Sequence, residues 1–410
     1  MSDPEHQTQS IPISQLTTGM YVISVNTGKG EIKIKSEGYI SSQDGIKKLK
    51  LAGVKHVTVD PTRDKNKPKE DKQTSVKESL SAIDLAVIKE KKNKTVALGK
   101  EMTKAHKLYN GAKDLQKKIL SEIQQDKEIN ISEIRENTDA IVDSIFRNQD
   151  ALSCLSRLRM KDEYLVEHSL NVSILMSIFA KHMKLDEPLI RDLALGAFLH
   201  DIGKIKVPDE VLHKPGKLID EEFVLMKEHV NHGVEVLKET PDLPDVTKEV
   251  VAQHHERIDG NGYPNGLSND EVSLYGRMIA IVDSYDAMTA ERVYKSGMHP
   301  IKAFKILTSN SPTSYDAGLV EKFIGCLGVY PVGTLVKLKS GKLGLISKLN
   351  FNQPLKPFVK VFYSARLNQA IPMEELDLSK KKYDDQIDSC IKPEDYNLNL
   401  MSFFKMAFLQ

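Results

Sequence analysis

The sequence predicts a mainly α-helical protein with a small α/β or β-rich domain at its start and a small β-rich extension at its end. Between residues 77 and 327, apolar residues recur at three- and four-residue steps, the spacing of helices that pack on a core. Runs rich in β-branched residues alternate with turn residues near both ends of the chain. The 410 residues suffice for about two or three domains.

Residues 1–62 form the expected N-terminal domain. Gly19–Val25 (GMYVISV) and Lys55–Asp60 (KHVTVD) have the composition and alternation of strands. Ser41–Val54 is an expected short helix between them. Gly53 is its expected C-terminal cap, because glycine tolerates the left-handed backbone conformation found at helix ends.

The rest of the chain divides by composition. Residues 63–76 are dominated by charged and polar side chains, which predicts a flexible linker. Residues 77–150 form an expected charged helical connector, either a packed helical subdomain or a dimerising helix pair. Residues 151–327 have long helical patterns and contain most of the unusual polar residues. Residues 328–410 are predicted to form a small β-rich extension with an apolar tail.

Charge and cysteine usage narrow the class of protein. Lysine and arginine number 58 and aspartate and glutamate 57, so no strong field attracts nucleic acid or an anionic membrane. The three cysteines, Cys154, Cys326 and Cys390, are widely spaced, as expected for a reducing compartment. No apolar run reaches the roughly 20 residues of a membrane helix, and the polar N-terminus does not resemble a secretion signal. We therefore expect a cytoplasmic protein with no membrane span and no nucleic-acid partner.

Histidine and aspartate residues interrupt the apolar faces of several predicted helices. His168 shares a face with Val172 and Leu175, where a lone histidine is more often a satisfied core residue than a ligand. The pair His200–Asp201 ends an apolar helix, and a buried carboxylate is costly unless it is paired or binds a metal. This pair therefore favours a metal site as much as a structural role.

The same residue types return further along the chain. His229 and His232 lie three residues apart on one predicted helix, and either is compatible with a structural role. The adjacent pair His254–His255 precedes a glycine-rich turn. Asp283 follows a run of aliphatic residues, and Asp286 lies on the same helical face three residues later. Isolated carboxylates on such a segment are costly, which again favours a metal.

Taken together, these residues predict a centre that holds two metal ions. Imidazole and carboxylate ligands without thiolates suit iron, manganese or zinc. Seven ligands are too many for one ion, but they suit two ions bridged by a carboxylate, which can clamp both oxygens of a phosphoryl displacement. The expected chemistry is hydrolysis of a phosphate ester by a metal-bound hydroxide. The expected ligands are His168, His200, Asp201, His229, His254, His255 and Asp283.

Three motifs in order resemble the HD-GYP domain family, a branch of the HD superfamily of metal-dependent phosphohydrolases. They are HDIGK at His200–Lys204, HHERIDGNGYP at His254–Pro264 and DSYDAMTAERVYK at Asp283–Lys295. The resemblance covers about residues 151–327. The N-terminal region is similar, more weakly, to the small domain known as DUF3391 that is often fused to HD-GYP domains.

The resemblance implies an all-α HD-type catalytic core that hydrolyses cyclic di-GMP to pGpG, GMP or both. It assigns two divalent ions, expected to be iron or manganese, to the seven ligands above, with Asp201 bridging them. Asp201 and Lys204 are the expected catalytic residues, and Lys204 would reach a phosphate or stabilise transition-state charge. The expected substrate-binding residues are Lys204, Gly262, Tyr263, Asp286, Arg292 and Lys295.

Two positions depart from the family pattern. Tyr164 stands where some members have a glutamate that binds a third ion, and the adjacent Glu163 points about 100° away around a helix. We therefore expect two ions and not three. Val293 stands where proline is frequent, between the two expected phosphate contacts, and we expect little effect from it.

Other functions remain open at this point. The domain is also compatible with a low-turnover cyclic-dinucleotide sensor, or with a scaffold that docks diguanylate cyclase (GGDEF) domains through its GYP loop. A phosphodiesterase for another cyclic dinucleotide, such as cyclic GMP-AMP, fits the same residues. The intact GYP loop argues against the nucleoside triphosphate or alarmone substrates of other HD proteins. A homodimer formed by the charged helices is a further expectation.

Overall fold

The computed structural model divides the chain into two compact units, Met1–Ala82 and Ile83–Gln410, and each unit is described by itself. The first unit contains a small sheet, and the second is mostly helical with a strand region near its end. This confirms the predicted mainly α-helical class with β-containing regions near both ends. The structure describes residues 8–26, 31–32, 38–40, 42–60, 96–125, 127–157, 164–238, 240–291, 296–311 and 313–408.

In the described part of the first unit, an antiparallel five-stranded sheet packs with one α-helix. The strands pair in the order β1-β5-β2-β3, and β4 pairs with another part of β2. Apolar side chains from the sheet, such as Val22 and Val57, share a core with Ile46 of the helix. The elements are β1 (Gln9–Pro12), η1 (Ile13–Gln15), β2 (Tyr21–Asn26), β3 (Glu31–Ile32), β4 (Gly38–Tyr39), α1 (Gln43–Leu51) and β5 (His56–Asp60).

Helix α1 begins and ends with ordinary capping residues. The Ser42 side chain accepts a hydrogen bond from the backbone N–H of Gly45. Gly53 follows the helix with φ of 79°, the left-handed conformation predicted for it. The expected linker, residues 63–76, and residues 77–95 of the expected connector lie outside the described residues.

Helices α5 and α6 form the centre of the second unit. Phe179 of α5 and Phe198 of α6 are fully buried, and helices α3, α4, α10 and α11 surround them. The helices that hold this core are α3 (Leu98–Gln124), α4 (Ile131–Leu155), α5 (Tyr164–His182), α6 (Glu187–Leu199), α10 (Asp245–Gln253) and α11 (Leu274–Thr289). The other helical segments are η5 (Ile202–Lys206), α7 (Asp209–Leu212), α8 (Asp220–Lys227), α9 (His229–Lys238), η6 (Asn269–Glu271), α12 (Pro300–Ser309) and α13 (Ala317–Leu327).

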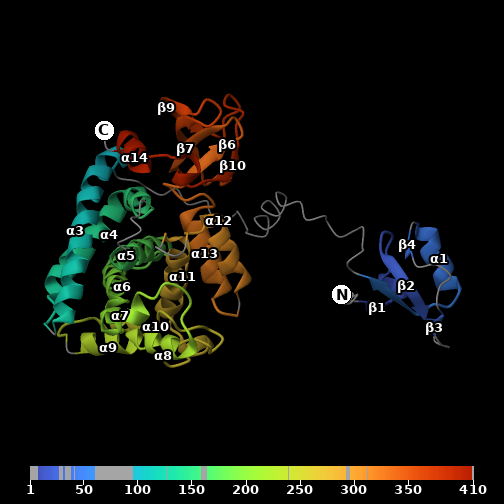
Figure 1. Ribbon diagram of the computed structural model, residues 1–410, viewed down its shortest axis with the longest axis horizontal. Helices are drawn as coiled ribbons and strands as arrows, with labels where there is room; N and C mark the ends of the chain where they lie inside the picture. Colours follow the sequence, from blue (N-terminus) through green and yellow to red (C-terminus); the bar gives the residue numbers. More distant parts are fainter. Residues whose placement is uncertain are drawn as a thin grey trace. The chain divides into compact units, whose positions relative to one another are not determined.

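The chain then forms a second antiparallel five-stranded sheet, with strand order β10-β6-β7-β8-β9. Phe362 of this sheet and Phe404 of the last helix belong to the same buried cluster as the helical core. Figure 1 shows the strands at one end of the helical body and helices α8 and α9 at the opposite end. The elements are β6 (Leu335–Leu338), β7 (Lys342–Lys348), β8 (Phe358–Ser364), β9 (Gln369–Asp377), β10 (Ile387–Cys390), η7 (Pro393–Tyr396) and α14 (Leu400–Phe408).

Buried polar contacts join α3 to its neighbours. Glu101 of α3 is almost fully buried, and its carboxylate accepts hydrogen bonds from Arg147 and Ser144 of α4. The Tyr109 hydroxyl donates to Asn171 of α5. These contacts fix α3 against α4 and against α5, the helix that carries His168. None of the described helices combines the length and apolar composition that crossing a bilayer requires.

We predict that Arg147→Met lowers the free energy of unfolding by about 2–3 kcal/mol, because the buried Glu101 carboxylate loses its charged partner. The matched control is Lys118→Met, which removes an exposed ion pair with Glu133 between the same two helices and should change the free energy of unfolding much less, because solvent screens this pair. Urea unfolding followed by circular dichroism measures both changes. Equal losses for the two variants would contradict the importance of the buried pair.

Candidate metal centre

The structure brings all seven predicted ligands together where several helices meet in the core. His168 lies on α5 and Asp283 on α11, whereas the others follow or begin helical segments. Their ligand atoms form two groups, and within each group all of these atoms lie within 4.8 Å of one another. One group is His168, His200 and Asp283, and the other is Asp201, His229, His254 and His255.

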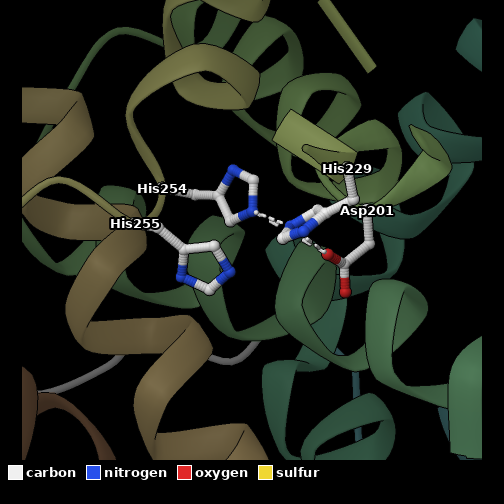
Figure 2. Close-up of side chains that lie close together, drawn as sticks. All are labelled: Asp201, His229, His254 and His255. Atoms are coloured by element: carbon white, nitrogen blue, oxygen red, sulfur yellow. Dashed lines mark hydrogen bonds and ion pairs between the residues drawn. The ribbon is translucent and has the colours of Figure 1, made fainter. Parts of the chain in front are cut away.

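Asp201 faces both groups with different oxygen atoms. Its Oδ2 lies 3.2 Å from Nε2 of His200 and 3.4 Å from Nε2 of His168. Its Oδ1 lies 3.4 Å from Nε2 of His229, and Figure 2 shows this contact. A carboxylate in this position suits a bridge between two ions.

Backbone carbonyl groups set the proton positions of three imidazole rings. In each ring, Nδ1 lies 2.6–2.7 Å from the carbonyl oxygen three residues earlier. Because a carbonyl oxygen can only accept, Nδ1 carries the proton and donates the hydrogen bond. These carbonyl groups come from the last turns of helices, where the regular helix hydrogen bonds have run out. The pairs are His200 with Ala197, His229 with Met226 and His254 with Val251.

The Nε2 atoms of these rings consequently present lone pairs to the centre. His229 and His254 bring their Nε2 atoms within 3.2 Å of each other, as Figure 2 shows. A hydrogen bond between these two Nε2 atoms would require one ring to move its proton from Nδ1 to Nε2. The bare Nδ1 and the carbonyl oxygen next to it would then be two acceptors in contact. Among the described residues, Nε2 of His200 and Oδ1 of Asp201 are buried and have no hydrogen-bond partner. A divalent cation would satisfy all of these atoms, so the residues fit the expected metal ions.

Burial keeps most of the histidines neutral and ready to bind a metal. It lowers the pKa of His229 to about 4 and that of His255 to about 3, and it holds the pKa of His254 well below its usual range. His168 is the exception. Burial opposes its charge, but hydrogen bonds to Asp283 and Asp286 outweigh burial and raise the pKa to about 9.

Asp286 lies on one side of the His168 ring, and Asp201 and Asp283 lie near the nitrogen on the other side. Its side chain is fully buried, and its Oδ2 lies 2.7 Å from Nδ1 of His168. The family resemblance predicts that Asp286 contacts substrate. The burial and this hydrogen bond instead favour a role in orienting His168, the common arrangement behind a metal-binding histidine.

Lys204 lies one turn after Asp201 and contacts the same carboxylate. Its Nζ atom is 2.6 Å from Oδ2 of Asp201, and the side chain is 16% exposed. Burial alone would raise the pKa of Asp201, but the neighbouring imidazole of His200 and the ammonium group of Lys204 outweigh burial and hold that pKa well below its usual range. Asp201 therefore stays ionised, as a bridging ligand requires.

A buried glutamate organises the loop that follows the histidine pair. The Glu256 carboxylate accepts hydrogen bonds from the backbone N–H groups of Asn265 at 2.7 Å and Leu267 at 2.9 Å. A Cβ atom at Gly262 would lie 2.6 Å from Cα of Glu256, so only glycine fits there. The role of Glu256 was not predicted from the sequence, although its position directly after two histidines could have marked it as part of the site.

The remaining predicted substrate contacts divide into two groups. Tyr263 lies beside the centre, with its ring centroid 4.6 Å from that of His255. Arg292 and Lys295, with Val293 between them, lie outside the described residues. Glu163 and the Tyr164 side chain, on which the expectation of two ions depended, are also outside the described part of the chain.

The glycine of the HDIGK motif permits close packing beneath the centre. A Cβ atom at Gly203 would collide with the carbonyl oxygen of His229 and the backbone nitrogen of Gly233. The backbone of η5 therefore touches that of α9 directly. This contact sets the distance between Asp201 and His229.

Comparison with known proteins agrees with this geometry. Residues 153–319 match the family model described as an HD domain, and residues 8–134 match the domain of unknown function DUF3391. The chain is 34% identical to a cyclic di-GMP phosphodiesterase of Pseudomonas aeruginosa, over 92% of this chain and 90% of that protein. It is 36% identical to a cyclic di-GMP phosphodiesterase of Thermotoga maritima, over 44% of this chain and 49% of the relative. It is 43% identical to a 3'3'-cGAMP-specific phosphodiesterase of Vibrio cholerae, over 30% of this chain and 24% of the relative.

The helical core and the buried histidine–aspartate cluster define an HD-type phosphodiesterase with a divalent-metal site. The chain belongs to the HD-GYP family, with a DUF3391 domain in front of the HD domain. The resemblance seen in the sequence motifs is thereby confirmed.

We expect Gly203→Ala to disrupt the centre, because the added methyl group must push η5 away from the backbone of α9. The variant should lose most of its bound metal and its activity while its helical content remains. Gly233→Ala is the matched control from the other side of the same contact, since its Cβ atom would meet Val251 only at an ordinary 3.4 Å. Metal analysis and circular dichroism test the pair, and a Gly203→Ala protein with full metal content would refute the packing argument.

Metal binding should release about one proton from His168 near pH 7, because this residue is protonated below about pH 9 in the metal-free protein and must become neutral to bind. His229 and His255 are already neutral and release none. The release should vanish well above pH 9, and metal affinity should rise with pH up to that point. Calorimetric titration with Mn²⁺ in buffers of different ionisation enthalpy measures it. Asp286→Asn should reduce the release, and an absence of release at pH 7 would contradict the assignment.

Proposed function

We propose that the protein is a phosphodiesterase that hydrolyses cyclic di-GMP to pGpG, GMP or both at a binuclear metal centre. The observation that carries this proposal is the position of Asp201, whose two oxygens face two separate groups of ligands. The relative from Pseudomonas aeruginosa, which this chain matches over 90% of its length, is named for the same substrate. A role in bacterial second-messenger signalling follows from that substrate.

Two divalent ions, iron or manganese, fit the nitrogen and oxygen ligands of this centre. His168, His200 and Asp283 would hold one ion, and His229 and the pair His254–His255 would hold the other, with Asp201 between them. When bound, such a pair supplies Lewis-acid activation of the phosphodiester and of a water molecule. The chain itself contributes the neutral imidazoles and the ionised carboxylates that make this binding favourable.

The residues around the centre have distinct proposed roles. Lys204 holds Asp201 in its ionised form, and its remaining N–H donors would stabilise charge on a phosphate oxygen. Tyr263 offers an aromatic face for guanine beside His255. Gly262 lets the loop approach the centre, and Arg292 and Lys295 keep their proposed role as phosphate contacts.

Cyclic GMP-AMP is the second candidate substrate, favoured by the match to the Vibrio cholerae enzyme. The other proposal is a slow enzyme that acts as a sensor or as a scaffold for GGDEF domains through the GYP loop. A cytoplasmic location fits the three free cysteines, of which Cys154 and Cys326 are buried. A homodimer through the charged helices is part of the same proposal.

The test is product analysis with anaerobically purified, metal-loaded protein on cyclic di-GMP, cyclic GMP-AMP and pGpG in parallel. We predict turnover of cyclic di-GMP, and a loss of more than about 100-fold in Asp201→Asn together with most bound metal. Lys204→Met should slow turnover while metal content stays near normal. The control is Asp209→Asn, an exposed carboxylate nearby in the sequence. Near-normal activity and metal content in Asp201→Asn would refute the two-metal assignment.

A further inference from the structure

Helix α8 exposes a large aromatic side chain next to the metal centre. Phe223 is 47% exposed, although a phenylalanine of this size is usually buried. The helix ends just before His229, a metal ligand, so Phe223 lies less than two helical turns from the centre along the chain. Packing of the core does not account for this exposed ring.

Three aromatic rings lead from the metal centre to the surface. The ring centroids of His255 and Tyr263 are 4.6 Å apart, and those of Tyr263 and Phe223 are 6.3 Å apart in an edge-to-face arrangement at 84°. His255 and Tyr263 are partly buried, whereas Phe223 at the outer end of the row is 47% exposed. The row is therefore continuous with the site where the phosphodiester would react.

A positive charge accompanies the outermost ring. Nζ of Lys227, one turn further along α8, lies 5.4 Å from the centroid of the Phe223 ring. An aromatic surface combined with a cation is the pair of features that proteins use to bind single-stranded nucleotides, by stacking the base and attracting the phosphate. Lys227 gives this aromatic surface the charge that complements a phosphate.

We propose that Phe223 and Tyr263 form a purine-base subsite for the cyclic dinucleotide. This inference rests on the proposed function and adds a specificity-determining residue to it. One phosphate of the substrate would lie at the metals while an attached base stacks at the Phe223–Tyr263 corner. Lys227 would face the anionic sugar–phosphate edge of the same nucleotide. Phe223 therefore contributes to substrate affinity and not to the chemical step.

The experiment compares Phe223→Ala with wild-type protein in two measurements. The first is equilibrium binding of a phosphorothioate analogue of cyclic di-GMP to metal-loaded protein, which does not depend on turnover. The second is the steady-state hydrolysis of cyclic di-GMP and of methyl p-nitrophenyl phosphate, a small diester that has no purine. We expect Phe223→Ala to weaken analogue binding and raise KM for cyclic di-GMP by about 5- to 100-fold. Its kcat, its metal content and its activity on the small diester should stay near normal, and Phe223→Trp should restore binding.

Leu225→Ala is the matched control. Leu225 is 45% exposed on the same helix, but it lies about 200° around the helix from Phe223. This variant should bind the analogue like wild type. An equal effect of both substitutions would overturn the subsite, because the loss of binding would then come from a general disturbance of α8.

The outcomes separate this inference from the proposed function. Unchanged analogue binding in Phe223→Ala overturns the subsite. The exposed ring would then be a candidate contact for a macromolecular partner. Equal losses on cyclic di-GMP and the small diester also overturn it, because the residue then supports the centre and not the base. Wild-type protein that binds the analogue but hydrolyses no cyclic di-GMP contradicts the proposed function, while the binding comparison still decides the subsite. Wild-type protein that does not bind the analogue overturns the subsite as well.

Discussion

The electrostatic repulsion between inward-facing histidine nitrogens is the constraint on which the rest of the centre depends. Carbonyl groups at the ends of helices accept hydrogen bonds from the Nδ1–H groups of His200, His229 and His254, so the Nε2 lone pairs of these rings face one another and Asp201. Burial removes the water that would otherwise separate these atoms, and it lowers the pKa values of His229 and His254. A protein pays for such an arrangement in stability unless a cation occupies it.

The fold keeps these atoms in place by joining helix ends to a rigid core. Helices α5 and α6 are buried in the centre of the second unit, and α10 and α11 pack against them. Direct backbone contact at Gly203 sets the spacing of Asp201 and His229, and the Glu256 carboxylate holds the following loop. Buried contacts from α3, such as the 3.0 Å ion pair of Lys113 with Glu167 beside His168, support the same region.

The sequence predicted the helical class and the histidine and aspartate residues that cluster in the core, because polar residues that are costly to bury are visible on apolar faces without coordinates. His200–Asp201 and Asp283 stood out in this way. The sequence did not reveal which imidazole nitrogen carries the proton, because that depends on carbonyl groups at helix ends. The sequence also did not reveal the contacts of Asp286 with His168 and of Phe223 with Tyr263, because the partners lie far apart in the chain.

The most direct test of the two-metal account is a crystal structure of anaerobically purified protein with anomalous diffraction recorded at the iron and manganese edges. The account predicts two anomalous peaks, one among His168, His200 and Asp283 and the other among His229, His254 and His255, with Asp201 bridging them. A single peak, or an Asp201 carboxylate that contacts only one ion, would contradict it. The absence of any peak in fully active protein would show that the chemistry does not need the metal pair.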